Sequence, residues 1–252
     1  MARTRRGISF DHFLAEGWAG LAGVDEAGRG ALAGPVVAAA VAVQTTVLRH
    51  RSLRQLARLV DDSKKLDPAR REEVLDRMGE MTDGLVLSGV GQATAAEVEE
   101  HNVLGATRVA MTQAIEELNG RLVGEGWVGV PPAWDAPSEE PTLGLFSEEG
   151  GDRWGLLIDG RPLRPFRWPH CALVGGDGRS FLIGLASIVA KVTRDRRMEE
   201  LAQTFPEYGF AAHKGYGTAR HWAALRTHGP TPEHRLSFLR KGGGRFSPEV
   251  DE

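Results

Sequence analysis

The order of apolar and polar positions predicts strands and helices that intermix along the chain. An apolar lead from Leu21 runs into two adjacent acids and a glycine-rich turn, and eight apolar residues follow from Val36. This is typical of a strand, a turn and a second strand, so we expect a hairpin over residues 21–43 with acids at its tip. Three further short strands are predicted over residues 84–91, 154–158 and 170–175.

Apolar residues at three- and four-residue spacing predict the helices. Asp67 and Pro68 have the pattern of an N-cap followed by a first helical residue. The predicted helices span residues 48–60, 68–81, 94–118 (with a break near Asn102), 180–205 and 219–228. Strands and helices in this order indicate an α/β fold with a central sheet and a helical C-terminal part.

Residues 120–152 have a different character, because glycine, proline and acids dominate and no period is present. We interpret them as a linker or surface excursion inserted into one domain, which Trp127, Trp134 and Phe146 could anchor in part. The expected organisation is an N-terminal arm over residues 1–20, one domain over residues 21–240 with this acidic insertion, and a flexible tail over residues 241–252.

Composition narrows the class of protein. A chain of 252 residues can bury a substantial core. The single Cys171 excludes a disulfide framework and fits a reducing compartment. No apolar run approaches the roughly 18 residues that a membrane span needs, and the basic start lacks an apolar signal core. We therefore expect a soluble cytoplasmic protein.

The net charge of −3 hides a segregation of charge along the chain. Residues 121–152 hold seven acids and one base, whereas residues 213–245 hold seven Lys or Arg and one Glu, with four His besides. Such a basic segment could face phosphates, or it could be a solvated surface without a partner.

Four acids lie where predicted strands end: Asp25, Glu26, Asp159 and Asp177. One sheet could bring them together, and Mg²⁺ and Mn²⁺ prefer such oxygen ligands. Two metals about 4 Å apart can activate water and stabilise the leaving oxygen in phosphodiester cleavage. An Asp before a Gly can instead be a turn residue. Neighbours on a strand point to opposite faces, so Asp25 and Glu26 can serve one site only if the strand ends or bends between them.

At this point a set of motifs resembles a known family, the type 2 ribonucleases H (ribonuclease HII) of bacteria. Each motif is modest alone, and their order along residues 21–240 is specific. The matching segments are Gly23–Gly30, Ala33–Val36, Asp62–Leu66, Ile158–Gly160, Ala186–Asp195, Phe210–Thr218, His234–Arg235 and Ser237–Phe238.

The resemblance implies a ribonuclease H-like mixed sheet flanked by helices, with a helical C-terminal extension and a catalytic domain over residues 21–240. It implies an endonuclease that hydrolyses the RNA strand of RNA/DNA hybrids. It also implies nicking on the 5′ side of single ribonucleotides in duplex DNA, leaving 3′-hydroxyl and 5′-phosphate ends. The expected cofactor is Mg²⁺ or Mn²⁺, and the expected state is a monomer.

The resemblance also carries roles to individual residues. Asp25, Glu26, Asp159 and Asp177 match the metal-binding acids. The turn Gly28–Gly30 matches the family's loop that reads the ribose 2′-hydroxyl, and Tyr216 matches its tyrosine that packs on the sugar. Lys64 and Lys65 could hold backbone phosphates or be a solvated pair at the start of a helix. His213, Lys214, His234 and Arg235 are expected to line or brace the groove. The substrate-binding candidates are Gly28, Arg29, Gly30, Lys64, Lys65 and Tyr216.

One departure from the family pattern concerns the fourth acid. The family usually has a Lys just before it, where this chain has Gly176. Asp195 is therefore an alternative to Asp177, although Lys191 and Asp195 are four apart on a predicted helix and could form a pair. The acidic insertion is a second departure and could lie near the substrate or be inert.

Three other readings stay open at this stage. A module that binds hybrid duplexes without cutting would not explain four acids that repel phosphate. A phosphatase acting on small phosphates would not need the basic segment, and the chain has no phosphate-loop lysine motif. The type 3 ribonucleases H are closer, but the Gly28–Gly30 turn favours type 2.

Overall fold

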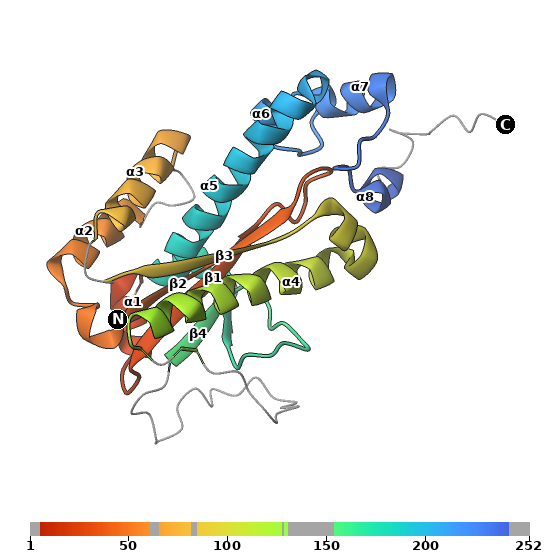
Figure 1. Ribbon diagram of the computed structural model, residues 1–252. Coiled ribbons are helices and arrows are strands. Elements are labelled where there is room, and N and C mark those ends of the chain that lie inside the picture. Colours follow the sequence, from red (N-terminus) through yellow and green to blue (C-terminus); the bar gives the residue numbers. More distant parts are fainter. Residues whose placement is uncertain (1–5, 61–65, 82–84, 128, 131–153, 242–252) are drawn as a thin grey trace, which may run out of the picture.

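A five-stranded mixed sheet runs through the computed structural model, which describes residues 6–60, 66–81, 85–127, 129–130 and 154–241 (Figure 1). Strand β1 pairs antiparallel with β2 and parallel with β4, while β3 and β5 form the edges. The predicted hairpin and α/β class are confirmed. In spatial order the strands are β3 (Leu87–Ala93), β2 (Val36–Gln44), β1 (Gly20–Ala27), β4 (Trp154–Asp159) and β5 (Cys171–Leu173).

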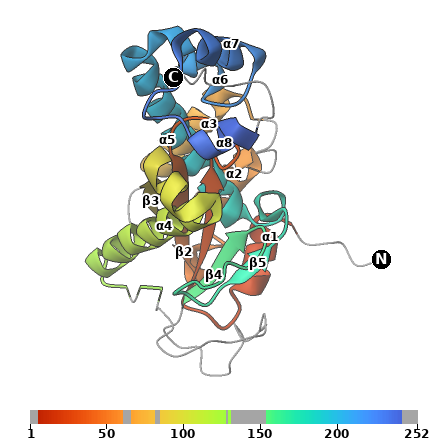
Figure 2. The same ribbon diagram turned by 90° about the vertical axis from the view of Figure 1, so that its right-hand side faces the viewer.

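Helices cover both faces of the sheet (Figures 1 and 2). Helix α4 (Ala95–Gly124) packs on β2 and β3, and α5 (Phe181–Thr204) packs on the opposite face against β1 and β2. Because both faces are covered, β2 is apolar at nearly every position. The face of α5 also holds α1 (Ile8–Leu14), α2 (Arg51–Val60), which follows a 3₁₀ turn at Thr45–Val47, and α3 (Pro68–Gly79).

A separate small core lies at the C-terminal end of α5, which contributes Met198 and Leu201, beside the turn of the β1–β2 hairpin (Figure 1). The sequence predicts α7 at its observed bounds, but it does not predict α6 or α8, which are too short to show a helical period. The elements here are the 3₁₀ turn Pro206–Tyr208, α6 (Phe210–His213), α7 (Ala219–His228) and α8 (Leu236–Lys241).

Side-chain caps begin the long helices where the sequence places them. Asp67 accepts a hydrogen bond from the Arg70 N–H at 2.8 Å, as expected of an N-cap. Ser180 caps α5 in the same way by accepting from the Ile183 N–H. The predicted break in α4 is confirmed, because Asn102 has φ 57° and ψ 170° and its side chain accepts from the Leu104 N–H.

Several boundaries differ from the prediction. Strand β3 begins at Leu87 rather than at residue 84, and α4 continues to Gly124. The helix therefore takes in the first residues of the segment 120–152, and Trp127, a predicted anchor of that segment, stacks on Trp154 with ring centroids 5.7 Å apart. Trp134, Phe146, Lys64, Lys65 and residues 242–252 lie outside the described residues.

The N-terminal helix is tied into the domain. Asp11 of α1 is fully buried, and its Oδ2 accepts a hydrogen bond from the Leu182 N–H in the first turn of α5 at 2.9 Å. Within the described ranges, no helix combines the length and the apolar character needed to cross a bilayer.

Candidate active site

The predicted acids gather at one end of the sheet because β1, β4 and β5 run parallel. Val24 pairs with Ile158 in register, so Asp25 and Asp159 hold the next positions on neighbouring strands. Asp159 pairs in turn with Leu173, and β5 leads into the short 3₁₀ turn Gly176–Gly178 that carries Asp177. The topology thus places all four acids at the carboxyl ends of parallel strands, where α/β folds commonly bind ligands.

Asp25 is the most buried of these acids, with 6 % of its surface exposed. Its Oδ1 accepts the Glu26 N–H at 2.7 Å, and Ser187 of α5 hydrogen-bonds to it. Burial raises the pKa of Asp25 well above its usual value, the negative charges of Glu26 and Asp159 raise it further, and the Ser187 hydrogen bond opposes the rise.

Glu26 interacts with a different neighbour, Arg29. The Arg29 Nη1 lies 2.8 Å from the Glu26 Oε1. Burial raises the pKa of Glu26, and Arg29 counteracts part of that rise. Strand β1 does not end between Asp25 and Glu26, because it stays paired with β2 through Ala27. The parallel pairing with β4 does end earlier, at Val24. The negative charge of Asp159 raises the pKa of both Asp25 and Glu26.

Asp159 is the last residue of β4, and Asp177 lies in the turn that follows β5. The Gly176 N–H donates to the Asp159 Oδ1 at 2.6 Å, so this carboxylate holds the turn that carries Asp177. A Cβ at Gly176 would lie 2.6 Å from the Ile183 Cδ1 and 3.1 Å from that carboxylate oxygen. The local packing therefore accommodates glycine where the family usually has a lysine.

The acids are near one another without forming a closed ligand set. Among the residues that the structure describes, no three His, Cys, Asp or Glu side chains are arranged to hold a metal ion together. Two of the acids already have partners, since Glu26 is paired with Arg29 and Asp159 accepts from the Gly176 N–H. A cation here would have to compete with those two contacts.

A cavity of about 380 Å³ opens in front of the acids. Six of the predicted site residues line it: Glu26, Asp177, the turn residues Gly28, Arg29 and Gly30, and Tyr216. Asp25 and Asp159 are not among the lining residues. The structure thus brings the predicted ribose-reading turn, the tyrosine and two of the acids to one opening.

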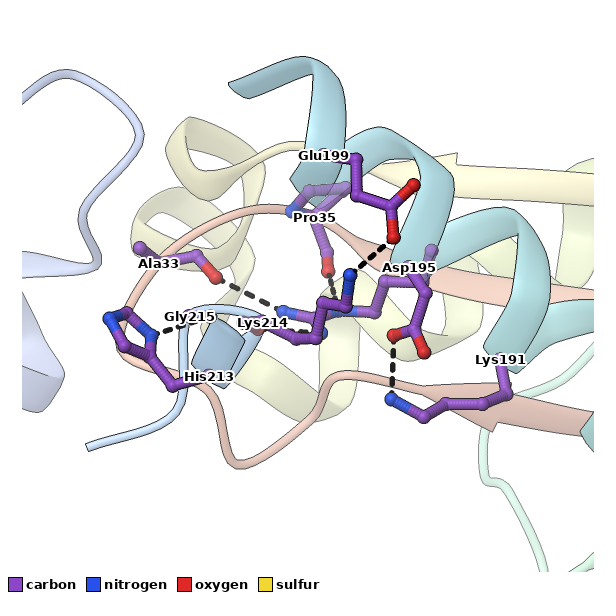
Figure 3. Close-up of polar contacts among 9 residues, drawn as sticks. Ala33, Pro35, Lys191, Asp195, Glu199, His213, Lys214 and Gly215 are labelled. Atoms are coloured by element: carbon purple, nitrogen blue, oxygen red, sulfur yellow. Dashed lines mark hydrogen bonds and ion pairs between the residues drawn. The ribbon is translucent and has the colours of Figure 1, made fainter. Parts of the chain in front are cut away.

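The alternative fourth acid, Asp195, occupies a different place. Its Oδ1 lies 2.6 Å from the Lys191 Nζ, the pair that the helical spacing predicts, and Figure 3 shows both side chains on α5. Asp195 does not line the cavity, whereas Asp177 does.

Tyr216 stands at the rim of the cavity with 39 % of its surface exposed. The guanidinium carbon of Arg194 lies 5.4 Å from the centroid of its ring, a cation–π distance. This contact supports one face of the ring from within the protein.

Sequence reasoning missed several residues around this opening. Ser187, Lys191 and the half-buried Arg71 of α3 line the cavity, and Arg194 is completely buried beside it. The helical period could have indicated Arg194, because it lies four residues from Ala190 and from Met198, which are both fully buried. No local pattern marks Arg71, whose position depends on how α3 packs.

Comparison with known proteins places the chain in a family. The family model described as Ribonuclease HII matches residues 22–140 and 166–241. A ribonuclease HII of Chloroflexus aggregans is 42 % identical over 225 residues, which is 89 % of each chain. The chain belongs to the ribonuclease HII family. As a member it is a hydrolase of the ribonuclease H type, and the type 2 resemblance is confirmed.

Solved structures agree on the fold of this ribonuclease HII family member. A ribonuclease H2 of Pyrococcus horikoshii OT3 superposes with a TM-score of 0.59 at 24 % identity, over 88 % of this chain and 96 % of that one. The Bst-RNase HIII in complex with Mn²⁺ gives a TM-score of 0.59 at 18 % identity, over 92 % of this chain and 70 % of that one. The mixed sheet with flanking helices and the helical C-terminal part is thus the shared architecture.

Proposed function

We propose that this chain is an endonuclease that hydrolyses the RNA strand of RNA/DNA hybrids and nicks duplex DNA on the 5′ side of single ribonucleotides. The products would carry 3′-hydroxyl and 5′-phosphate ends. One observation supports this most directly: two of the acids at the strand ends, Glu26 and Asp177, share a cavity with the glycine-flanked turn Gly28–Gly30 and with Tyr216. Such a site combines hydrolytic groups with groups suited to a nucleotide.

Recognition of the ribose is assigned to the turn. The 2′-hydroxyl is the group that distinguishes RNA from DNA at a given nucleotide. Gly28 has φ 91°, a conformation that L side chains rarely adopt, and Gly30 has open space where a Cβ would be. The backbone of this turn can therefore approach a sugar closely, while the ring of Tyr216 packs against the sugar at the junction.

Phosphate binding is assigned to the basic side chains of the rim. Arg29, Arg71 and Lys191 line the cavity, and Arg71 forms no ion pair among the described residues. Lys64 and Lys65 remain candidates for the same role. Backbone phosphates dominate affinity for nucleic acids, so these cations would hold the strand while the turn reads the sugar.

Metal binding fits the chemistry of the donor set, which consists of carboxylate oxygens. Asp25, Glu26, Asp159 and Asp177 would hold Mg²⁺ or Mn²⁺. Burial first, and then the negative charges of Glu26 and Asp159, raise the pKa of Asp25, and a bound cation would favour its charged form. A pair of bound cations would activate a water and neutralise the charge that develops on the leaving 3′-oxygen. The chain's own residues contribute the orientation of Asp25 through Ser187 and of Asp159 through the Gly176 N–H.

We also propose the setting in which the activity is used. The substrate class points to ribonucleotide excision repair in the cytoplasm, with the enzyme acting as a monomer. The single Cys171, half-buried and not in a disulfide, supports a reducing compartment.

The test is cleavage of a labelled duplex that carries one ribonucleotide, in Mg²⁺, in Mn²⁺ and in EDTA. We expect one nick 5′ of the ribonucleotide with either metal, none in EDTA, and none in the matching all-DNA duplex. Binding without cleavage in Mg²⁺ and Mn²⁺ would favour the non-cutting module instead.

Asp25→Asn should remove the nick while the protein stays folded, because the change is isosteric and removes a costly buried charge. The loss should exceed the roughly 10- to 100-fold that removal of an outer-shell partner costs. Asp177→Asn and Asp195→Asn form a matched pair: we expect a large loss from the first and a small one from the second. The reverse result would assign the fourth acid to Asp195.

A further inference from the structure

Two arginines are completely buried behind the turn that faces the substrate cavity. Arg194 comes from α5, and Arg235 directly precedes α8. Both have no exposed surface, which is rare for an arginine unless its guanidinium is fully hydrogen-bonded. Their partners are carbonyl oxygens of the loop that joins β1 to β2, residues 28–35, here called the 28–35 loop.

Arg194 holds the far end of the 28–35 loop. Its Nε donates to the Pro35 carbonyl at 3.0 Å and its Nη2 to the Ala33 carbonyl at 3.1 Å. Its Nη1 donates to the Lys214 carbonyl at 2.9 Å. Figure 3 shows Ala33 and Pro35 on the loop beside Lys214 and α5. Arg194 therefore joins the loop, α5 and the C-terminal part.

Arg235 holds the near end of the same loop. Its Nη1 donates to the Gly28 carbonyl at 2.8 Å and to the Arg29 carbonyl at 3.1 Å, and its Nη2 donates to the Gly34 carbonyl at 2.7 Å. Its main-chain N–H donates to the Leu32 carbonyl at 2.8 Å. One side chain thus closes the loop by joining residues from both of its ends.

The turn also packs directly on Arg194. A Cβ at Gly28 would lie 2.0 Å from the Arg194 Nε, so only glycine leaves room for the guanidinium at this point. Gly28 and Arg194 are separated by more than 160 residues in the chain, and their contact is a product of the fold. A shift of either group would displace the other.

Burying these two cations costs free energy of folding, so their presence points to a role other than stabilising the fold. Burial and, to a smaller extent, the positive charge of Arg194 lower the pKa of Arg235 to about 10, so Arg235 remains charged near neutral pH. The salt bridges among the described residues include neither arginine. Apolar side chains of similar volume would avoid this penalty, but they could not hold carbonyl groups in a set direction.

The direction of those carbonyls determines what the turn presents to the cavity. The carbonyls of Gly28 and Arg29 point to Arg235, while the N–H groups of Arg29 and Gly30 have no acceptor among the described residues. Each peptide plane is rigid, so holding its carbonyl also orients the N–H on its opposite side. The turn is thereby held with donor groups available on its outer side.

We propose that Arg194 and Arg235 are positioning residues that orient the peptide groups of Gly28–Gly30 for the ribose, and so set the preference of this site for a ribonucleotide over a deoxyribonucleotide. The inference rests on the proposed function, because it concerns how the same turn reads its substrate. It also gives a role to the C-terminal extension, which supplies Arg235 and the carbonyl of Lys214 to the arrangement.

The experiment measures binding, so that cleavage does not obscure recognition. In the Asp25→Asn background and in EDTA, fluorescence anisotropy compares a duplex that carries one ribonucleotide with the same duplex made of DNA alone. Arg235→Lys and Arg194→Lys should each lower the ratio of the two affinities by roughly 3- to 10-fold, the equivalent of about one hydrogen bond. Affinity for the all-DNA duplex should change less than about 2-fold, because the phosphate contacts remain.

Two further variants separate positioning from general stability. Leu118→Ala removes a fully buried side chain from α4 on the opposite face of the sheet, and should lower the melting temperature without changing the affinity ratio. Gly28→Ala displaces the turn from Arg194 without removing a buried charge, and should lower the ratio as the lysine variants do.

A ratio that is unchanged in folded Arg235→Lys, Arg194→Lys or Gly28→Ala protein would overturn the proposal, as would an equal fall in Leu118→Ala. If the lysine variants do not fold, Arg235→Gln and Arg194→Gln, which keep an amide donor without the charge, decide the question, because they leave the turn's own residues unchanged. Failure of the unmodified chain to nick a ribonucleotide would instead refute the proposed function, so the two failures are distinguishable.

Discussion

Asp25 shows how a single side chain is prepared for its proposed role. It is held by the main-chain N–H of Glu26 and by Ser187, and it lies beside two further acids. Each hydrogen bond restricts its rotation, and the neighbouring charges make it a strong attractor for a cation. Ser187 faces both the cavity and Asp25, so its hydroxyl is the clearest supporting group in the site.

Ser187→Ala should lower the rate of nicking by roughly 10-fold to 100-fold, the range for loss of an outer-shell partner. The physical reason is the freedom that Asp25 gains when this hydrogen bond is lost. Cleavage kinetics at several Mg²⁺ concentrations would measure the effect, and higher Mg²⁺ should recover part of the rate. Thr193→Ala, at a half-buried position on the same helix, is the control. Equal rates in the two variants would contradict the role given to Ser187.

At the scale of elements, α5 connects most of the molecule. Its first turn receives Asp11 from α1, its second turn carries Ser187, and its middle carries Arg194. The Asp11 carboxylate sits at the N-terminal end of this helix, where backbone N–H groups lack partners within the helix. Burial nevertheless dominates and raises the pKa of Asp11 to about 7, although the Leu182 N–H opposes the rise.

This raised pKa predicts a pH-dependent stability. The folded state holds the Asp11 proton more tightly than the unfolded state does, so the free energy of unfolding should fall as the pH rises from about 4 to about 7. Asp11→Asn keeps an acceptor for Leu182 and cannot ionise, so it removes this loss. Urea unfolding of both proteins at pH 4.5 and pH 8 should show the unmodified chain losing up to roughly 3 kcal/mol relative to the variant. A difference independent of pH would contradict the assignment.

At the scale of the whole molecule, charge is arranged to suit a polyanionic partner despite a net charge of −3. The excess of basic residues lies over residues 213–245, and α7 exposes Arg220 and Arg226. This helix stands at the same end of the molecule as the turn of the β1–β2 hairpin (Figure 1). Helix α2, at the opposite end, exposes Arg51 and Arg58.

The salt dependence of cleavage tests whether substrate binding depends on where the arginines lie or only on the net charge of the protein. Replacing both Arg220 and Arg226 by Ala should make the fall of log(kcat/KM) with log salt less steep by up to about 2, since each lost phosphate contact accounts for about 0.9. Replacing both Arg51 and Arg58 by Ala changes the net charge equally and should leave the slope unchanged. Equal slopes in the two double variants would show that the basic segment is only a solvated surface.

Local sequence signals were sufficient for much of the fold and for the choice of candidate residues. The period of apolar positions, the caps at Asp67 and Ser180 and the break at Asn102 depend on neighbours a few residues away, so they can be read from the chain. The positions of Asp25, Glu26, Asp159 and Asp177 at strand ends follow from the same local patterns. The short helices α6 and α8 were not predicted, because too few residues are present to show a helical period.

Only the tertiary structure decided how distant parts meet. Parallel pairing brings Asp25 beside Asp159, and the packing of α5 brings Ser187 to Asp25. The contacts of Arg235 with the Gly28 and Gly34 carbonyls join residues more than 200 positions apart. Such contacts follow from the balance of packing over the whole chain, and no local pattern contains that information. The residues for the chemistry were thus visible in the sequence, whereas their burial, their partners and the support of the turn arose from folding.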